Sequence, residues 1–210
     1  MPKEVVILLV FSLALVLALT VMAPPPPRPA APVVVVVDAG HGGSDPGAVV
    51  AGVREKDVNL AIALRVERKA QAVPGLQVVL TRSTDVYPTL LERVRLAEEV
   101  GARLYVSIHA NYYRDPKICG VETWVDSGAC GESLRLAREL QRAVASATRA
   151  PDRGVHRQTL YLRHTSLPAA LVEVGYLSCP AERTKLLDPA YQDRVAEGIL
   201  QGILAFLSAP

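Results

Sequence analysis

Two histidines and two glutamates, in four separate parts of the chain, have the residue types of a metal-dependent active site. His41 and His109 each follow an apolar run and lie in a turn rich in Gly, Ala and Asn. Glu55 follows a glycine-rich stretch, and Glu173 lies within a further apolar run. A hydrolytic zinc site needs three neutral or anionic ligands, an open position for water and one more carboxylate that moves protons. The four side chains therefore suggest such a site.

Both glutamates also have structural explanations. Glu55 is expected at a helix start, where a carboxylate complements the helix dipole. A carboxylate inside an apolar strand is costly unless it is paired or bound. Glu173 could therefore form a buried ion pair with Arg157 or Arg82 instead. Spacing alone leaves these interpretations open.

The other two histidines, His156 and His164, differ from His41 and His109 in their surroundings. Neither lies in a tight turn after a long apolar run, so we expect both to be structural or solvated. Because the carboxyl ends of parallel strands meet at one edge of a sheet, where ligands bind, we expect His41 and His109 to lie close together.

Strands and helices are predicted in alternation along most of the chain. Five consecutive valines at 33–37 indicate a strand that is buried on both faces. The other expected strands are 77–81, 104–108, 120–125, 159–162 and 169–174. Apolar stripes at helical spacing predict helices at 56–72, 89–100, 133–147 and 191–207. This alternation predicts one α/β domain with a mostly parallel, twisted sheet of about six strands flanked by helices on both faces.

The N-terminus differs in composition from the rest of the chain. Residues 5–22 are apolar except for Ser12 and Thr20, a length close to that of a membrane-spanning helix. We expect 1–23 to be an uncleaved membrane anchor, because Pro24 disfavours cleavage after the small residues before it; cleavage would give a secreted protein. The proline-rich segment 24–32 predicts a stiff linker, and the folded domain would then be 33–210.

Composition and charge exclude some classes of partner. The net charge is +2 over 210 residues, aromatic residues make up 5%, and no basic block is present, so a nucleic-acid partner is not expected. None of the three cysteines, Cys119, Cys130 and Cys179, lies in a Cys-x-x-Cys pair. A Cys119–Cys130 disulfide is one possibility, and the odd count leaves at least one thiol free or paired between chains.

Five motifs together resemble the zinc-dependent N-acetylmuramoyl-L-alanine amidases typified by the bacterial cell-separation amidases. The resemblance runs in order from about Val33 to Leu207. The motifs are DAGHGGSDPGA at 38–48, EK at 55–56, LTR at 80–82, SIHAN at 107–111 and LVEVGYLS at 171–178.

The resemblance implies a zinc enzyme that acts on peptidoglycan outside the cytoplasm. It implies that the zinc ligands are His41, Glu55 and His109. Zinc would lower the pKa of its bound water, and Glu173 would move the proton from that water to the leaving amine. The bond cleaved would join the lactyl group of N-acetylmuramic acid to the L-alanine of the stem peptide.

Five further residues are predicted to support this chemistry. Asp38 and Asp45 are candidates for orienting the histidine rings. Arg82, Arg93 and Asn111 are candidate contacts for the anionic peptide, and each could equally be a structural residue.

One departure from the family bears on regulation. The cell-separation amidases often carry a long helical insert that plugs the zinc site, whereas here only residues 126–132 separate a strand from the next helix. We therefore expect no obligate activator protein. Two alternatives to the amidase are a zinc peptidase acting on stem peptides and an inactive wall-binding module.

Overall fold

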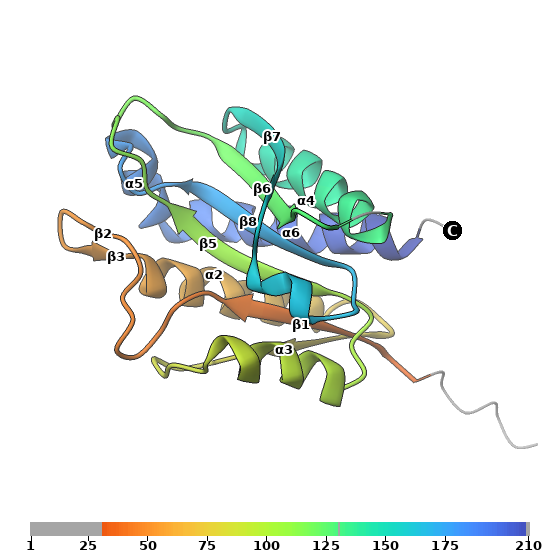
Figure 1. The fold of residues 1–210 in the computed structure, drawn as a ribbon. Helices are drawn as coiled ribbons and strands as arrows, with labels where there is room; N and C mark the ends of the chain where they lie inside the picture. The colour runs from red at the N-terminus through yellow and green to blue at the C-terminus, as the bar shows by residue number, and fades with distance from the viewer. Residues whose placement is uncertain (1–30, 130, 209–210) are drawn as a thin grey trace, which may run out of the picture. The chain divides into compact units, whose positions relative to one another are not determined.

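A six-stranded mixed sheet forms the centre of the fold (Figure 1). The structure is a computed structural model that describes residues 31–129 and 131–208. The strands of the sheet are β1 (Val33–Ala39), β4 (Leu76–Leu80), β5 (Tyr105–Asn111), β6 (Val121–Asp126), β7 (Asp152–Gln158) and β8 (Ala169–Tyr176). Their order is β4-β1-β5-β8-β6-β7, and every pair is parallel except β6 with β8. The predicted mostly parallel sheet of six strands is confirmed.

Helices cover both faces of this sheet, unequally. Three long helices pack on one face: α2 (Glu55–Ala70), α4 (Glu132–Thr148) and α6 (Pro189–Ser208). Among the described residues, the other face carries only α3 (Leu90–Glu99) and the short 3-10 helix η1 (Tyr161–His164). The remaining elements are a small hairpin, β2 (Val49–Val50) with β3 (Val53–Arg54), and the short helix α5 (Pro180–Leu186). Part of the second face is therefore left open beyond η1.

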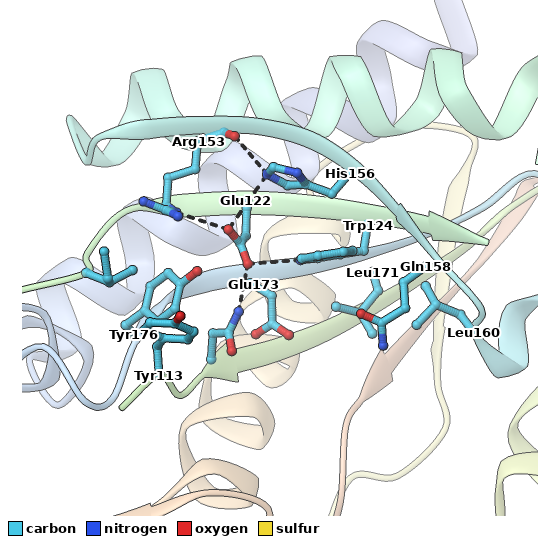
Figure 2. A pocket seen from close by; sticks show the side chains of 12 residues that line it. Tyr113, Glu122, Trp124, Arg153, His156, Gln158, Leu160, Leu171, Glu173 and Tyr176 are labelled. Atoms are coloured by element: carbon cyan, nitrogen blue, oxygen red, sulfur yellow. Dashed lines mark hydrogen bonds and ion pairs between the residues drawn. The ribbon is translucent and has the colours of Figure 1, made fainter. Parts of the chain in front are cut away.

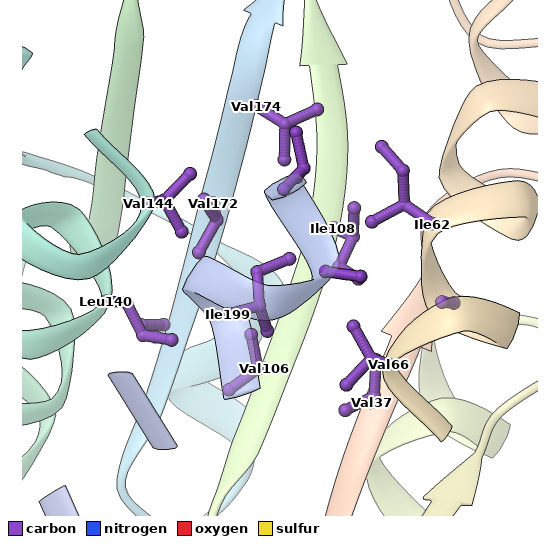
Figure 3. Packing of buried hydrophobic residues seen from close by; sticks show 14 of the residues in the cluster. Val37, Ile62, Val66, Val106, Ile108, Leu140, Val144, Val172, Val174 and Ile199 are labelled. Atoms are coloured by element: carbon purple, nitrogen blue, oxygen red, sulfur yellow. The ribbon is translucent and has the colours of Figure 1, made fainter. Parts of the chain in front are cut away.

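The main core lies between the sheet and the three long helices. Figure 3 shows Ile199 of α6 between Leu140 of α4 and Ile62 of α2, above Val106 and Val172 of the sheet. Each of these side chains is fully buried. Burying a side chain of this size contributes about 1.5–3 kcal/mol, so this layer stabilises the sheet that carries the site.

Alternation along the strands decides which side chains face the open side. Val35 and Val37 of β1 belong to the main core, whereas Val36 packs with Ala97 of α3 and Tyr105 of β5 on the opposite face. Successive side chains in a strand point to opposite faces. Side chains with the parity of Tyr105 in β5 therefore point away from the long helices and towards the open face.

The prediction of a strand at 159–162 is wrong. The structure places the sixth strand at β7, before the predicted range 159–162, and the apolar residues Tyr161 and Leu162 lie in the 3-10 helix η1 instead. The edge strand β7 pairs only with β6, and of its seven residues only Val155 packs against the main core. An edge strand with so little apolar surface gives no strong hydrophobic signal.

The cysteines pair differently from the possibility considered above. Cys119 forms a disulfide with Cys179, across a sequence separation of 60 residues, so the Cys119–Cys130 pairing is wrong. The bond joins the β5–β6 loop to the turn that follows β8.

The predicted anchor at 1–23 lies outside the described residues, as does the linker except for its last two residues. Within 31–129 and 131–208, no helix combines the length and apolarity needed to cross a bilayer. Residues from Pro32 onward form one compact unit, which confirms the prediction of a single α/β domain.

Candidate active site

A row of polar side chains crosses the open face of the sheet, from the loop after β1 to the start of β6. His109 of β5 is the register partner of Glu173 of β8, and Glu173 is in turn the partner of Glu122 of β6. His41 follows β1, next to β5. Residues at matched register on adjacent strands point to the same face, so the row extends from the end of β1 across to β6.

Three of the four predicted residues converge on one point. The ligand atoms of His41, Glu55 and His109 all lie within 4.8 Å of one another. Glu55 Oε1 lies 3.1 Å from His41 Nε2 and 2.8 Å from His109 Nδ1. Two imidazoles and one carboxylate are donors that zinc prefers in catalytic sites. The structure therefore brings together the predicted ligand set.

The loop that carries His41 has a backbone shape that requires glycine on either side. His41 itself has φ 61°, in the left-handed region that is costly for a residue with a side chain. A Cβ on Gly40 would overlap the His109 ring, and a Cβ on Gly47 would lie 2.6 Å from Glu55 Oε2. The absence of side chains at these two glycines allows the three ligands to approach one another.

Asp45 lies where the sequence predicts a residue that orients a histidine. Its Oδ2 lies 2.7 Å from His41 Nδ1. A proton on Nδ1 would be donated to this carboxylate and would leave the Nε2 lone pair for a metal ion. Burial lowers the pKa of His41, but hydrogen bonds with Glu55 and Asp45 outweigh it and raise the pKa above its usual value.

Glu55 is fixed at the first residue of α2. Its Oε2 accepts a hydrogen bond from the Ala48 amide at 2.9 Å, and Oε1 accepts bonds from the Ala110 amide and from Asn59. Burial raises the pKa of Glu55, but the neighbouring His109 and His41 rings lower it well below its usual value. The carboxylate is therefore ionised and aimed between the two rings, as a metal ligand must be.

Glu173 differs from Glu55 in having no such partners. Its Oε2 is a buried oxygen without a hydrogen-bond partner among the described residues. Burial raises the pKa of the Glu173 carboxyl well above its usual value, and the Glu55 and Glu122 carboxylates raise it further. The ion pair with Arg157 or Arg82 that the sequence left open does not form: Arg157 contacts the 127–129 turn, and Arg82 contacts backbone carbonyls. Such an unpaired buried oxygen indicates a functional carboxyl group.

A cavity of about 570 Å³ opens beside Glu173 (Figure 2). Figure 2 shows Arg153, His156 and Trp124 converging on the carboxylate of Glu122. The expectation that His156 is merely structural or solvated is therefore incomplete, because it lines this cavity. His164 lies in η1, where its ring packs against Tyr161.

Sequence reasoning missed Glu122 and Arg153. Glu122 was available from alternation in the strand, since Val121, Thr123 and Val125 face the core and the residues between them must face the open side. Arg153 lies in β7, the strand that hydrophobic patterning did not locate.

A second and more apolar groove of about 310 Å³ lies on the other side of the histidines. It lies between α3, η1 and the open face of the sheet, and its apolar lining includes Tyr87, Leu90, Leu160, Leu162 and Leu171. The two hollows share Leu160 and Leu171. The side chains of His41 and His109 thus border an apolar groove, and Glu173 borders a polar cavity.

The positions of Arg82 and Arg93 do not support the prediction that they contact the peptide. Each is only 3% exposed. Their guanidinium groups donate to backbone carbonyls, including Gly40 for Arg82 and His41 for Arg93. With its donors engaged in this way, each arginine holds the His41 loop in place rather than offering a charge to a substrate.

Asp38 also has a different role from the one predicted. It contacts neither histidine ring; it accepts hydrogen bonds from Arg93, Thr81 and Ser107, each at 2.6 Å. Burial raises the pKa of Asp38, but Arg93 and the two hydroxyls lower it below its usual value overall. The resulting buried ion pair ties β1 to α3.

Asn111 does line the larger cavity, where its side-chain amide donates to Glu122 Oε1 at 2.7 Å.

Comparisons with known proteins agree with the fold and with the family that the motifs resemble. LytC of Bacillus subtilis, an N-acetylmuramoyl-L-alanine amidase, is 37% identical over 172 residues, which cover 81% of this chain and 34% of LytC. The germination-specific N-acetylmuramoyl-L-alanine amidase of the same organism is 37% identical over 190 residues, which cover 82% of this chain and 78% of that protein. The crystal structure of N-acetylmuramoyl-L-alanine amidase from Clostridium difficile 630 superposes with a TM-score of 0.83 and 36% identity, covering 86% of this chain and 99% of that one.

The chain spans about a third of the length of LytC, so LytC contains much that has no counterpart in this match. The sequence also matches the N-acetylmuramoyl-L-alanine amidase family over residues 35–205, a range that begins in β1, ends in α6 and contains all four predicted active-site residues. With fold, ligand geometry and family in agreement, the chain belongs to the N-acetylmuramoyl-L-alanine amidases, as its motifs predicted.

Proposed function

We propose that this protein hydrolyses the amide bond between the lactyl group of N-acetylmuramic acid and the L-alanine of the stem peptide in peptidoglycan. Membership of the amidase family supports the reaction. The observation that carries the mechanism is the position of Glu173, whose buried Oε2 has no hydrogen-bond partner among the described residues and which lies one strand away from His109.

The donor set fits zinc. His41 Nε2, His109 Nδ1 and the Glu55 carboxylate provide three ligands, the number found in catalytic zinc sites that keep a position open for water. When bound there, zinc would make a water acidic enough to ionise near neutral pH and would polarise the scissile carbonyl. Asp45 holds the His41 ring in the tautomer that ligation needs.

Glu173 moves the proton in this mechanism. Its free Oε2 accepts a proton from the attacking water and then donates it to the nitrogen of the departing L-alanine. Burial and the neighbouring carboxylates raise the pKa of Glu173, which makes its carboxylate a stronger base than that of an ordinary glutamate. Proton delivery requires the leaving nitrogen to lie on the Glu173 side of the ligands.

The setting of the enzyme follows from its substrate. The domain would act outside the cytoplasm, with 1–23 as a membrane anchor and 24–32 as a linker. We further propose that no partner is needed to open the site. The connection from β6 to α4 spans only residues 127–131, which is too short to form a helix that covers the ligands.

The test is digestion of purified peptidoglycan by the full-length chain in detergent, with product masses measured before and after treatment with a chelator. The amidase predicts intact stem peptides with a free L-alanine amine, lost on chelation and regained on adding zinc. Shortened peptides would instead identify a peptidase. Absence of any cleavage by zinc-loaded protein would contradict an independent enzyme and favour a binding module.

A further inference from the structure

The polar cavity beside Glu173 is built around a buried carboxylate. Glu122 is 3% exposed, and both of its oxygens are engaged. Its Oε1 accepts hydrogen bonds from Asn111 Nδ2 at 2.7 Å and Trp124 Nε1 at 3.0 Å. Its Oε2 accepts one from Arg153 Nε at 3.1 Å. A buried carboxylate with this many donors is an anchor for its neighbours rather than a site that a ligand can reach.

Arg153 presents the accessible charge. Its side chain is 35% exposed, compared with 3% for Glu122, and its guanidinium lies 5.5 Å from the centre of the Tyr176 ring. Glu122 uses the Nε edge of the guanidinium, and the Nη groups carry the remaining donors of the planar fork. An arginine oriented in this way by a buried carboxylate and an aromatic ring is suited to binding a second carboxylate.

Supporting residues keep this arrangement in place. The His156 ring packs against Trp124 in a tilted arrangement with centroids 4.8 Å apart, and His156 Nε2 lies 2.8 Å from the Arg153 carbonyl oxygen. On the opposite wall, Ile118 lines the cavity next to Cys119, whose disulfide holds the β5–β6 loop. The anchor, the arginine and the wall are thus fixed by packing and covalent structure.

The order of strands decides which end of the substrate meets Arg153. The spatial order across the open face is His109 on β5, Glu173 on β8, Glu122 on β6 and Arg153 on β7. If Glu173 protonates the leaving nitrogen, the departing peptide must continue past Glu173, away from the ligands and towards β6 and β7. The sugar side then lies towards the apolar groove of α3 and η1, where Tyr87 and Leu90 offer surface for a ring or a methyl group.

We propose that Arg153, held by Glu122, binds a carboxylate on the peptide side of the scissile amide and so selects for substrates whose residue after L-alanine carries a free α-carboxylate. The proposal rests on the function proposed above. Arg153 thus takes the peptide-binding role predicted for Arg82 and Arg93. Those two arginines donate to backbone carbonyls, whereas Arg153 lines the cavity.

The test compares two soluble muramoyl dipeptides that differ at one group. Both contain N-acetylmuramoyl-L-alanine joined to glutamate, with the α-carboxylate free in one and converted to the carboxamide in the other. We expect the zinc-loaded full-length enzyme to cleave the carboxylate form with a kcat/KM about 10-fold to 100-fold higher, the range for a hydrogen bond to a charged group. Arg153→Gln should remove this preference, mainly through KM on the carboxylate substrate, and Arg153→Lys should restore part of it.

Arg157→Gln is the matched control, because Arg157 lies on the same strand but donates to the backbone of Ser127 and Ala129 instead. It should keep the wild-type preference. Equal rates of the wild type on both substrates, or an Arg153→Gln variant that loses activity on both equally, would overturn the role of Arg153. A wild type that cleaves neither dipeptide nor peptidoglycan would overturn the proposed function itself, and the inference with it.

Discussion

The two sides of the open face are held in place by different means. On the side of β1 and β5, buried arginines bind the backbone: Arg82 and Arg93 donate to carbonyls of the loop that carries His41. On the side of β6 and β7, a single buried carboxylate, Glu122, gathers side chains, and a disulfide from Cys119 secures the wall.

This difference matches the tasks that we propose for the two sides. Metal ligands need positions fixed to a fraction of an ångström, and a loop tied through its own carbonyls has little freedom. A peptide-binding wall needs accessible side chains, so its charge lies on Arg153, which is partly exposed. The first side should therefore respond to substitution with a loss of stability or metal, and the second with a change in substrate preference.

The largest effect is expected from breaking the buried Asp38–Arg93 ion pair, on the side of β1 and β5 where the proposed metal ligands lie. Asp38→Asn leaves the Arg93 charge without its partner in a place where both side chains are almost fully buried. We expect a loss of about 3–5 kcal/mol in the free energy of unfolding, measured by chemical denaturation. Asp57→Asn is the control, since the Asp57–Arg54 pair is exposed and should contribute less than about 1 kcal/mol.

The same ion pair predicts a pH dependence. The pKa of Asp38 is lowered on folding from its ordinary value of 3.8. Its contribution to stability is therefore complete above pH 3.8 and is lost as the pH falls through the lower pKa of the folded state. The stability difference between the wild type and Asp38→Asn should stay constant from neutral pH down to about pH 4 and narrow below it. A difference that narrows near neutral pH would assign the effect to another group.

The next largest loss of stability is expected from removing the disulfide on the side of β6 and β7. Replacing Cys119 and Cys179 with serine opens a loop of 60 residues and should cost about 2–4 kcal/mol of stability. Zinc affinity should be unchanged, because the bond lies on the cavity wall rather than at the ligands. Reduction of the wild-type protein should reproduce the loss. An accompanying loss of zinc would show that the two sides are not separately supported.

A smaller effect is expected at the residue that orients His41. Asp45→Ala removes the acceptor for His41 Nδ1 and should weaken zinc binding by about 10-fold to 100-fold, as measured by competition with a chromogenic chelator. Asp45→Asn keeps an acceptor oxygen and should weaken it less. Equal affinities for all three proteins would mean that the ring is oriented by its other contacts.

The convergence of His41, Glu55 and His109 was predicted from the motifs that resemble the amidase family, because spacing alone left structural explanations open. His41 follows β1 in a glycine-rich turn and Glu55 begins α2, whereas His109 lies within β5 and not in the turn that the sequence predicted. What the sequence could not show is which polar residues serve the backbone. Arg82 and Arg93 have the same charge as a substrate-binding arginine, and only their burial and carbonyl contacts reveal the difference.

The β6–β7 side was mostly unpredicted because it depends on pairing between distant segments. Arg153 acquires its position from an edge strand with little apolar surface, and Cys119 meets Cys179 only after the chain has crossed the sheet. The predicted strand at 159–162 failed for a related reason. Its apolar side chains do cover the sheet, but as the 3-10 helix η1 packed on α3 and β6.

The central claim is that binding zinc and moving the proton are performed by different glutamates. The most direct test measures zinc content and kcat together in Glu173→Gln and Glu55→Gln. We predict that Glu173→Gln retains one zinc per chain while kcat falls by about 10²–10⁴-fold, the contribution of a general acid–base group, and that Glu55→Gln loses the zinc. Loss of zinc in Glu173→Gln, or a kcat close to that of the wild type, would contradict this division of roles.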